Sequence, residues 1–223
     1  MRIELAVLDM AGTVVSDDGL VVRAFEEAAS AVGVPAEGEE REAARRYVLD
    51  TMGQSKIQVF KTLFGDDGRA AEANSAFEMA YARHLDGGVA PIDGAVQTIS
   101  ELREAGVRVA LVTGFSPSTQ QRLLDALGWQ DVADVALAPG PGVRGRPCPD
   151  LVLTALMRTG VDDVRKVAVA GDTASDISSG RSAGAGVVAG VLTGAHDAQA
   201  LHAAGATHVL TSIAELPQIL LSA

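Results

Sequence analysis

Five polar residues of this 223-residue chain are placed where they could do chemistry together: Asp9, Thr113, Arg146, Asp172 and Asp176. Asp9, Thr113 and Asp172 follow short apolar runs typical of buried strands, Arg146 lies in the loop after another such run, and Asp176 is four residues beyond Asp172. Because parallel strands present their carboxyl ends at one edge of a sheet, we expect all five residues to meet there. Taken singly, each has a plainer interpretation as a strand end, a helix cap or a solvated loop charge.

The carboxylates suit phosphoryl transfer assisted by a metal ion. Asp9 is a candidate nucleophile of the kind that forms an aspartyl-phosphate. A hard cation such as Mg²⁺ prefers oxygen ligands, which Asp9, the Ala11 carbonyl and Asp172 could supply. Asp176, one turn after Asp172 on the same helix face, would orient the ligands or a metal-bound water. We therefore predict Mg²⁺ as the cofactor.

The remaining two polar residues suit the transferred group itself. The Thr113 hydroxyl and the Arg146 guanidinium are donors that could bind the equatorial oxygens of a phosphoryl group. A GxxxxGK sequence is absent, which excludes the P-loop route to phosphate chemistry. The predicted partner is accordingly a small phosphorylated or phosphonate substrate.

The elements that must position these residues alternate between strand and helix from residue 91 onward. Such alternation predicts an α/β fold, a doubly wound parallel sheet with helices on both faces. The expected strands are residues 3–8, 107–112, 132–137, 166–170 and 187–192, with an edge strand at 208–210. The expected helices between them are residues 93–105, 118–127, 150–159 and 175–183.

The stretch between the first strand and residue 91 has no convincing strand. Its apolar spacing predicts helices at residues 22–29, 39–49, 57–63 and 70–85. We interpret residues 17–90 as a helical cap inserted into a core formed by residues 1–16 and 91–223. We expect hinges near Ser16 and Pro91, which would let the cap open for substrate and close to exclude water.

Composition excludes several classes of partner. The net charge of −11 argues against nucleic acid and against an anionic membrane surface. Apolar runs are too short to span a bilayer, and the single cysteine, Cys148, cannot form an internal disulfide or a CxxC metal site. A cytoplasmic protein is the expectation, with homodimer formation left open.

Four segments of the chain resemble the four motifs of the haloacid dehalogenase superfamily. They are Asp9-Met-Ala-Gly-Thr, Leu111-Val-Thr-Gly, Gly145-Arg-Pro and Gly171-Asp-Thr-Ala-Ser-Asp. The resemblance covers nearly the whole chain, with the inserted helices in the place of that superfamily's cap. It implies a Mg²⁺-dependent hydrolase with Asp9 as the nucleophile, and it places Gly114 with Thr113 and Arg146 at the substrate.

Two features are similar to the phosphonoacetaldehyde hydrolase (phosphonatase) branch of that superfamily. Phosphatases of the superfamily carry a second Asp two residues after the nucleophile as a general acid, where this chain has Ala11. The segment from Met52 to Lys56 resembles the phosphonatase segment that holds an imine-forming lysine and a nearby methionine. The resemblance implies that Lys56 forms an imine, which would act as an electron sink for breaking a carbon–phosphorus bond.

The chain also departs from phosphonatases on the side that contacts the substrate's carbon atoms. It has Val59 in place of a histidine, Phe115 in place of a tyrosine, and Asp150 after Pro149 in place of a tryptophan. Lys56 has an alternative interpretation as a solvated lysine on a helix face, and Met52 as a core side chain. A phosphatase of small organophosphates and a catalytically weak binding protein remain the alternative functions.

Overall fold

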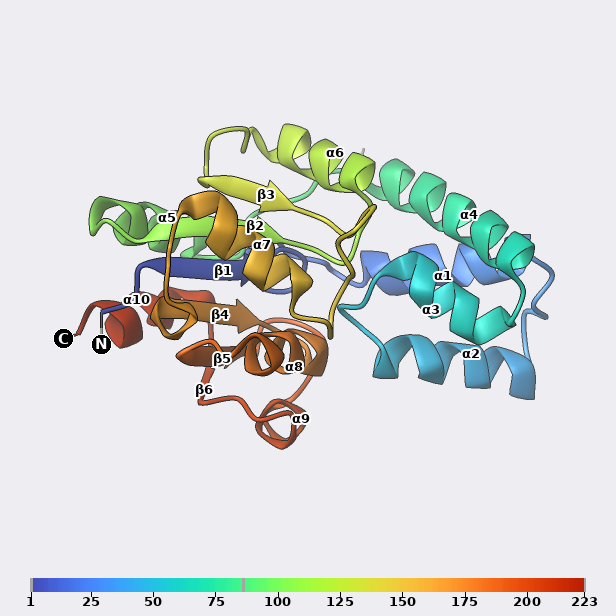
Figure 1. Cartoon of the computed structure of the whole chain (residues 1–223). Coiled ribbons are helices and arrows are strands. Elements are labelled where there is room, and N and C mark those ends of the chain that lie inside the picture. Colours follow the sequence, from blue (N-terminus) through green and yellow to red (C-terminus); the bar gives the residue numbers. More distant parts are fainter. Residues whose placement is uncertain (1, 86, 223) are drawn as a thin grey trace.

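The computed structural model describes residues 2–85 and 87–222 and contains one six-stranded parallel sheet (Figure 1). The strand order is β3-β2-β1-β4-β5-β6, so the first strand lies at the centre. The strands are β1 (Leu5–Asp9), β2 (Arg108–Val112), β3 (Val135–Leu137), β4 (Val167–Gly171), β5 (Val187–Val191) and β6 (His208–Leu210). The predicted doubly wound α/β sheet is confirmed.

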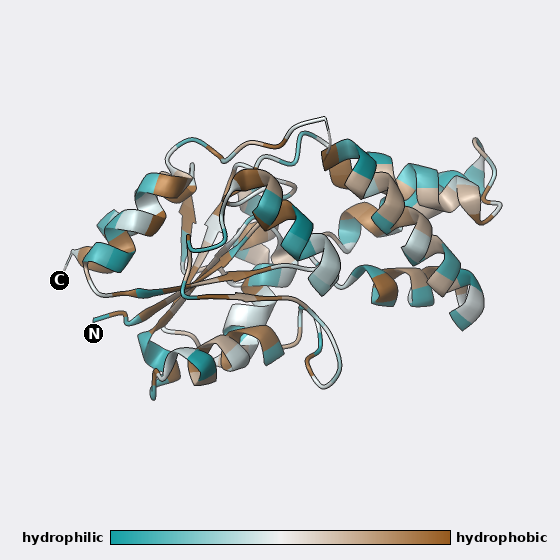
Figure 2. Ribbon diagram, turned by 90° about the horizontal axis from the view of Figure 1, so that it is seen from above, coloured by the Kyte–Doolittle hydropathy of each residue, from teal (hydrophilic) through white to brown (hydrophobic). Residues whose placement is uncertain are grey.

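Six helices flank the sheet, and their apolar residues fall into two clusters, one for each face. Helices α5 (Ala95–Glu104), α6 (Pro117–Leu127) and α10 (Leu216–Leu221) pack with Ala6 and Leu8. Helices α7 (Asp150–Thr159), α8 (Ala174–Ala183) and α9 (Ala198–Ala203) pack with Leu5 and Val7. The alternation along β1 thus buries both faces of the central strand, which explains its continuous apolar run (Figure 2).

One predicted strand is shorter than expected. The apolar run over residues 132–137 forms a strand only from Val135 to Leu137. The Asp134 carboxylate accepts a hydrogen bond from the backbone N–H of Val109 at 2.8 Å, where a longer β3 would present a backbone carbonyl. The Asp134 side chain therefore takes the place of the first backbone hydrogen bond between β2 and β3. Val132 and Ala133 lie in a bend before β3 and pack against the core.

Four helices lie beyond the carboxyl ends of the strands (Figure 1): α1 (Leu20–Ala31), α2 (Glu39–Asp50), α3 (Lys56–Phe64) and α4 (Asp67–Leu85). The two connections to the sheet run side by side, because Ser16 N–H donates to the Ala90 carbonyl at 2.9 Å and Ile92 N–H donates to Val14 at 3.0 Å. No helix within residues 2–85 and 87–222 combines the length and apolar character that a membrane crossing requires.

Candidate active site

Sheet register brings the predicted residues to one place. Asp9, the last residue of β1, is level with Val112 of β2, and Leu8 is level with Ala170 of β4. Thr113 and Asp172 follow their strands within two residues of these positions, so both flank Asp9. Parallel pairing alone accounts for this juxtaposition.

A buried arginine connects two of the carboxylates. Arg146 Nη1 donates to Asp9 Oδ1 at 2.5 Å and also pairs with Asp176 Oδ1. Asp9 and Arg146 are each only 4% exposed, so these ion pairs are shielded from solvent. The Arg146 Nε–H is buried and has no hydrogen-bond partner among the described residues, which leaves a donor for an anionic ligand.

Asp172 lies on the other side of Asp9 and is held by two donors. Thr13 Oγ1 donates to Asp172 Oδ1 at 3.1 Å, and the Ala195 N–H donates to Oδ2 at 2.7 Å. Burial, together with the neighbouring Asp9 charge, raises the pKa of Asp172 to about 7. The site therefore concentrates negative charge that favours either a proton or a cation.

The expected placement of Asp172 and Asp176 on one helix face is wrong. Helix α8 begins at Ala174, so Asp172 precedes the helix and only Asp176 belongs to it. Thr173 is the N-cap, and its backbone N–H donates to Asp176 Oδ2 at 3.1 Å in a capping box. The capping geometry turns the chain at Thr173 and fixes the Asp176 carboxylate toward Arg146.

The donor set fits a hard divalent cation. Asp9, Asp172 and Asp176 each offer a carboxylate oxygen, and these three oxygens lie within 4.8 Å of one another. Nitrogen and sulfur ligands are absent from this set, as suits Mg²⁺. Ala11 lines the same cavity. The cluster is thus compatible with the predicted metal site.

Thr113 and Gly114 lie in the loop after β2, which the helical segment contacts closely. Thr113 Oγ1 accepts a hydrogen bond from the Phe115 N–H at 3.2 Å, and the Gly114 carbonyl accepts one from the Lys56 N–H at 3.3 Å. A Cβ on Gly114 would lie 2.4 Å from the Gln54 carbonyl oxygen. Only glycine lets the segment before Lys56 come this close.

We expect Gly114→Ala to displace that segment and to lower kcat/KM by about 10²-fold, the usual effect of moving a reacting group by about 1 Å. Gly140→Ala is the matched control, since a Cβ there meets nothing within 4 Å. Steady-state kinetics of the two variants measure the difference, and equal activities would show that the close approach at Gly114 does not matter.

Lys56 begins helix α3, and its side chain is buried rather than solvated. Its Nζ lies 5.3 Å from the ring centre of Phe115, 5.7 Å from that of Phe25 and 6.0 Å from that of Phe77. Within the described residues Nζ forms neither a hydrogen bond nor an ion pair. The surface alternative for Lys56 is therefore wrong.

The surroundings of this amine favour its neutral form. Burial, reinforced by the Arg146 charge, lowers the pKa of Lys56 to about 8, although Asp9, Asp17 and Asp172 oppose the shift. About a tenth of the amine is therefore unprotonated at pH 7. An unprotonated amine is a nucleophile, which a surface lysine is not at this pH.

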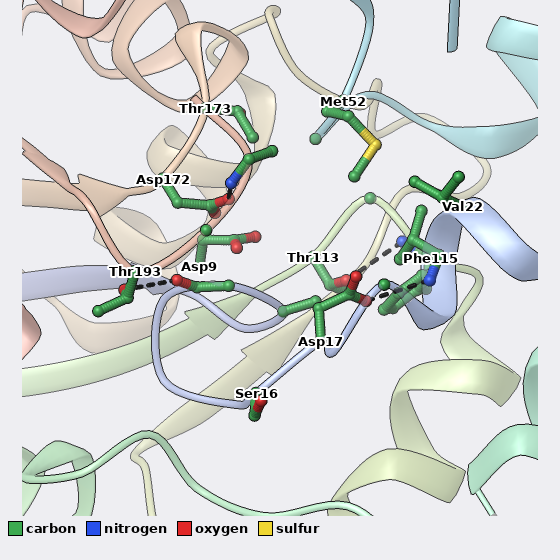
Figure 3. Close-up of a pocket in the computed structure, with 18 of the residues that line it drawn as sticks. Asp9, Ser16, Asp17, Val22, Met52, Thr113, Phe115, Asp172, Thr173 and Thr193 are labelled. Atoms are coloured by element: carbon green, nitrogen blue, oxygen red, sulfur yellow. Dashed lines mark hydrogen bonds between the residues drawn. The ribbon is translucent and has the colours of Figure 1, made fainter. Parts of the chain in front are cut away.

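One cavity of about 390 Å³ is lined by Asp9, Lys56, Thr113, Arg146 and Asp172. Met52, which is partly buried, also lines it. In the view of Figure 3, Asp172 and Thr193 flank one side of Asp9, and Asp17 and Phe115 lie on the other. All the predicted site residues except Asp176 line this cavity, and Asp176 joins them through Arg146.

Sequence reasoning missed several contributors to the cavity. Thr13 and Ala195 position Asp172, and Thr193 Oγ1 donates to the Gly12 carbonyl at 2.7 Å. Asp17 belongs to Ser16-Asp17-Asp18-Gly19, a polar stretch whose composition indicates only a turn. Its place in the connection after the strand that ends at Asp9 was the available signal. Ala195 contributes only a backbone N–H, so its side chain carries no signal.

A family model for haloacid dehalogenase-like hydrolases matches residues 3–184. The chain belongs to the haloacid dehalogenase-like hydrolase family. The matched range extends from just before β1 to just beyond α8. It therefore includes Arg146 and the three clustered carboxylates, Asp9, Asp172 and Asp176. The protein is accordingly a hydrolase of this family.

The chain is also similar to individual proteins named phosphonoacetaldehyde hydrolase. Phosphonoacetaldehyde hydrolase of Bordetella avium is 28% identical over 196 residues, covering 79% of this chain and 67% of that protein. The protein of that name from Bacteroides fragilis is 29% identical, over 98% of this chain and 96% of its own length. A phosphonoacetaldehyde hydrolase-like protein from Oleispira antarctica has the same fold, with a TM-score of 0.84 and 22% identity over 100% of this chain and 92% of that one.

Proposed function

We propose that this hydrolase cleaves the carbon–phosphorus bond of phosphonoacetaldehyde or a related small phosphonate bearing an aldehyde. The observation that carries the proposal is Lys56, a residue that is only 7% exposed and lines the same cavity as the carboxylate Asp9. A buried amine with a lowered pKa suits imine formation with a carbonyl compound. The relatives named phosphonoacetaldehyde hydrolase support the same substrate class.

The proposed reaction begins at the carbonyl carbon. Unprotonated Lys56 adds to the aldehyde, and one added proton lets the carbinolamine hydroxyl leave as water, which gives a protonated imine. Asp9 then attacks phosphorus, and the electron pair of the carbon–phosphorus bond moves into the protonated imine to form an enamine. Protonation of the enamine carbon and hydrolysis of the imine release acetaldehyde and free Lys56. Water finally hydrolyses the aspartyl-phosphate, which returns Asp9.

Ala11 explains why the imine is needed. A methyl group at this position cannot donate a proton to a leaving group, and loss of a positioned general acid typically costs a factor of about 10² to 10⁴. The imine removes the need for that acid at the bond-breaking step, because the departing carbon is stabilised as a neutral enamine.

The phosphonate oxygens would be bound by this chain's own donors. The unpartnered Arg146 Nε–H is available to one oxygen, and Thr113 is available to another. Asp9, Asp172, Asp176 and the Ala11 carbonyl would hold Mg²⁺, which when bound would offset the negative charges of the nucleophile and the phosphonate. Without that cation the carboxylates would repel an anionic substrate.

We further propose that residues 17–90 act as a cap that closes over the cavity. Lys56 and Met52 come from this segment, whereas Asp9 and Thr113 come from the sheet. Opening at the paired connections near Ser16 and Pro91 would admit substrate, and closure would bring Lys56 to the aldehyde and exclude water.

The proposal is tested by incubating the protein with Mg²⁺ and phosphonoacetaldehyde. We expect acetaldehyde and phosphate to be released in equal amounts. A small alkyl phosphate is the comparison substrate. Release of phosphate from the alkyl phosphate with no acetaldehyde from the phosphonate would overturn the proposal and favour the phosphatase alternative.

Removal of the metal gives a second expected result. We expect excess chelator to abolish turnover and added Mg²⁺ to restore it, since three clustered carboxylates need a counter-charge. Asp172→Ala should abolish turnover with the circular dichroism spectrum unchanged. Full activity in the presence of excess chelator would contradict the metal assignment.

A further inference from the structure

Asp17 is an acidic residue of the cavity that lies outside the carboxylate cluster around Asp9. It belongs to the connection between β1 and α1 and lines the cavity together with Lys56 and Phe115. In Figure 3 it lies on the side of Asp9 away from Asp172. It is therefore placed on the side of the cavity where the carbon atoms of a substrate would lie, since the phosphorus is expected near Asp9 and Arg146.

The carboxyl group of Asp17 is held by backbone donors at the start of α1. Oδ1 accepts a hydrogen bond from the Val21 N–H at 3.2 Å, and the Asp17 carbonyl accepts one from the Leu20 N–H at 2.7 Å. These bonds fix the residue at the first turn of α1. The carboxyl group therefore has a fixed position in the lining of the cavity, where it can exchange a proton with a ligand.

The surroundings of Asp17 raise the pKa of its carboxyl group toward that of Lys56. Burial raises the pKa of Asp17, whereas the Val21 N–H and the charges of Lys56 and Arg23 oppose the rise. Tyr81 of α4 is also close enough to feel the Asp17 charge, and burial raises the pKa of its phenol, so it stays uncharged. The Asp17 and Lys56 charges interact although the two groups form no ion pair within 4 Å.

We propose that Asp17 is the acid–base residue of this cavity, which carries protons between Lys56 and the carbon side of the substrate. The proposal rests on the function proposed above and assigns a residue to the proton transfers that the imine route requires. Val59 and Phe115, at the positions where phosphonatases have a histidine and a tyrosine, cannot exchange protons.

The proton transfers balance with Asp17 as the only additional group. Through one intervening water molecule the Asp17 carboxylate takes a proton from the Lys56 ammonium. The freed amine then adds to the aldehyde to give a carbinolamine. The Asp17 carboxylic acid then donates its proton to the carbinolamine hydroxyl, which leaves as water. The products of this step are the protonated imine and the original carboxylate, and no oxidant or reductant is consumed.

Asp17→Asn tests the proposal, because the amide oxygen can still accept from the Val21 N–H while the group no longer exchanges protons. We expect kcat with phosphonoacetaldehyde to fall about 10²-fold. Asp50→Asn is the matched control, since Asp50 is exposed and does not line the cavity. We expect it to keep wild-type kcat. Asp17→Asn activity within threefold of wild type would overturn the proposal.

The pH dependence separates proton transfer from a purely electrostatic role. Asp17 raises the pKa of Lys56, so its removal should leave more neutral amine and speed the reaction at neutral pH if charge were its only contribution. We expect instead a loss at neutral pH that becomes smaller above pH 8, because Lys56 has then lost the proton that Asp17 would carry. A gain at neutral pH, or a loss that grows above pH 8, would contradict the proposed role.

A parallel assay distinguishes failure of this proposal from failure of the proposed function. If wild-type protein releases no acetaldehyde but hydrolyses an alkyl phosphate, the imine route is wrong. Asp17 is then expected to protonate the leaving alkoxide. In that case Asp17→Asn should slow alkyl phosphate hydrolysis and spare nitrophenyl phosphate, whose stable anion leaves without a proton. Equal effects on both esters, or no wild-type activity on any of these substrates, would overturn the assignment of Asp17.

Discussion

Asp9→Asn should abolish turnover, with a loss on the order of 10⁴-fold or more. An amide is a poor nucleophile, so the aspartyl-phosphate cannot form. The substitution nearly preserves the shape of the side chain and leaves the Arg146–Asp176 pair in place. Phosphate release from the variant, measured against wild-type protein under saturating Mg²⁺, checks the expectation. Residual activity above about a hundredth of wild type would indicate direct attack by water instead.

The same variant should fold without loss of stability in the absence of added metal. Asp9, Asp172 and Asp176 place three carboxylates within 4.8 Å around one arginine, so removal of one negative charge relieves repulsion. We expect an equal or higher Tm for Asp9→Asn in chelator. A strongly lowered Tm would mean that the activity loss reflects misfolding, and the assignment of Asp9 as the nucleophile would then lose its support.

Lys56→Arg should lower phosphonoacetaldehyde cleavage by a factor on the order of 10³ or more, because a guanidinium stays charged and cannot form an imine. Acetaldehyde release measures this loss. Hydrolysis of an activated phosphate ester is the control reaction, and it should fall much less because it needs no imine. A Lys56→Arg variant with wild-type acetaldehyde release would remove the imine from the mechanism.

The burial of Lys56 also predicts an effect on stability. Its pKa of about 8 lies below the ordinary 10.5, so the unfolded chain binds more protons than the folded one between those pH values. The resulting cost is about 3 kcal/mol below pH 8 and is relieved as the pH rises toward 10.5. Lys56→Met should therefore raise the free energy of unfolding at pH 7 while abolishing acetaldehyde release. Such opposition between stability and activity is typical of a functional residue.

The sequence predicted the sheet well because buried parallel strands form continuous apolar runs that end at glycines or polar residues. The exception, β3, depended on one side chain. The Asp134 carboxylate accepts the hydrogen bond from the Val109 N–H that a backbone carbonyl of a longer β3 would accept. An aspartate just before an apolar run does not indicate such a bond in the sequence. The start of α8 was predicted to within one residue, but Asp172 was wrongly placed on this helix, because the Thr173–Asp176 capping box shows only when the helix boundary is known.

The sequence predicted those residues of the site that lie at the ends of strands. Asp9, Thr113 and Asp172 follow directly from the register of three neighbouring strands. The burial of Lys56 could not be derived in this way, because it depends on rings from α1, α4 and the loop after β2 that converge in space. Asp17 was missed because a polar turn cluster has the same composition whether it faces solvent or a cavity.

Reductive trapping of Lys56 tests the central claim most directly. The protein is incubated with phosphonoacetaldehyde and borohydride, and the modified residue is located by mass spectrometry of its peptides. We expect a two-carbon adduct on Lys56, loss of activity in proportion to labelling, and no label in Lys56→Arg. Labelling should rise with pH up to about 8 as the amine loses its proton. Full activity after this treatment, with Lys56 unmodified, would contradict the imine and with it the assignment of carbon–phosphorus bond cleavage.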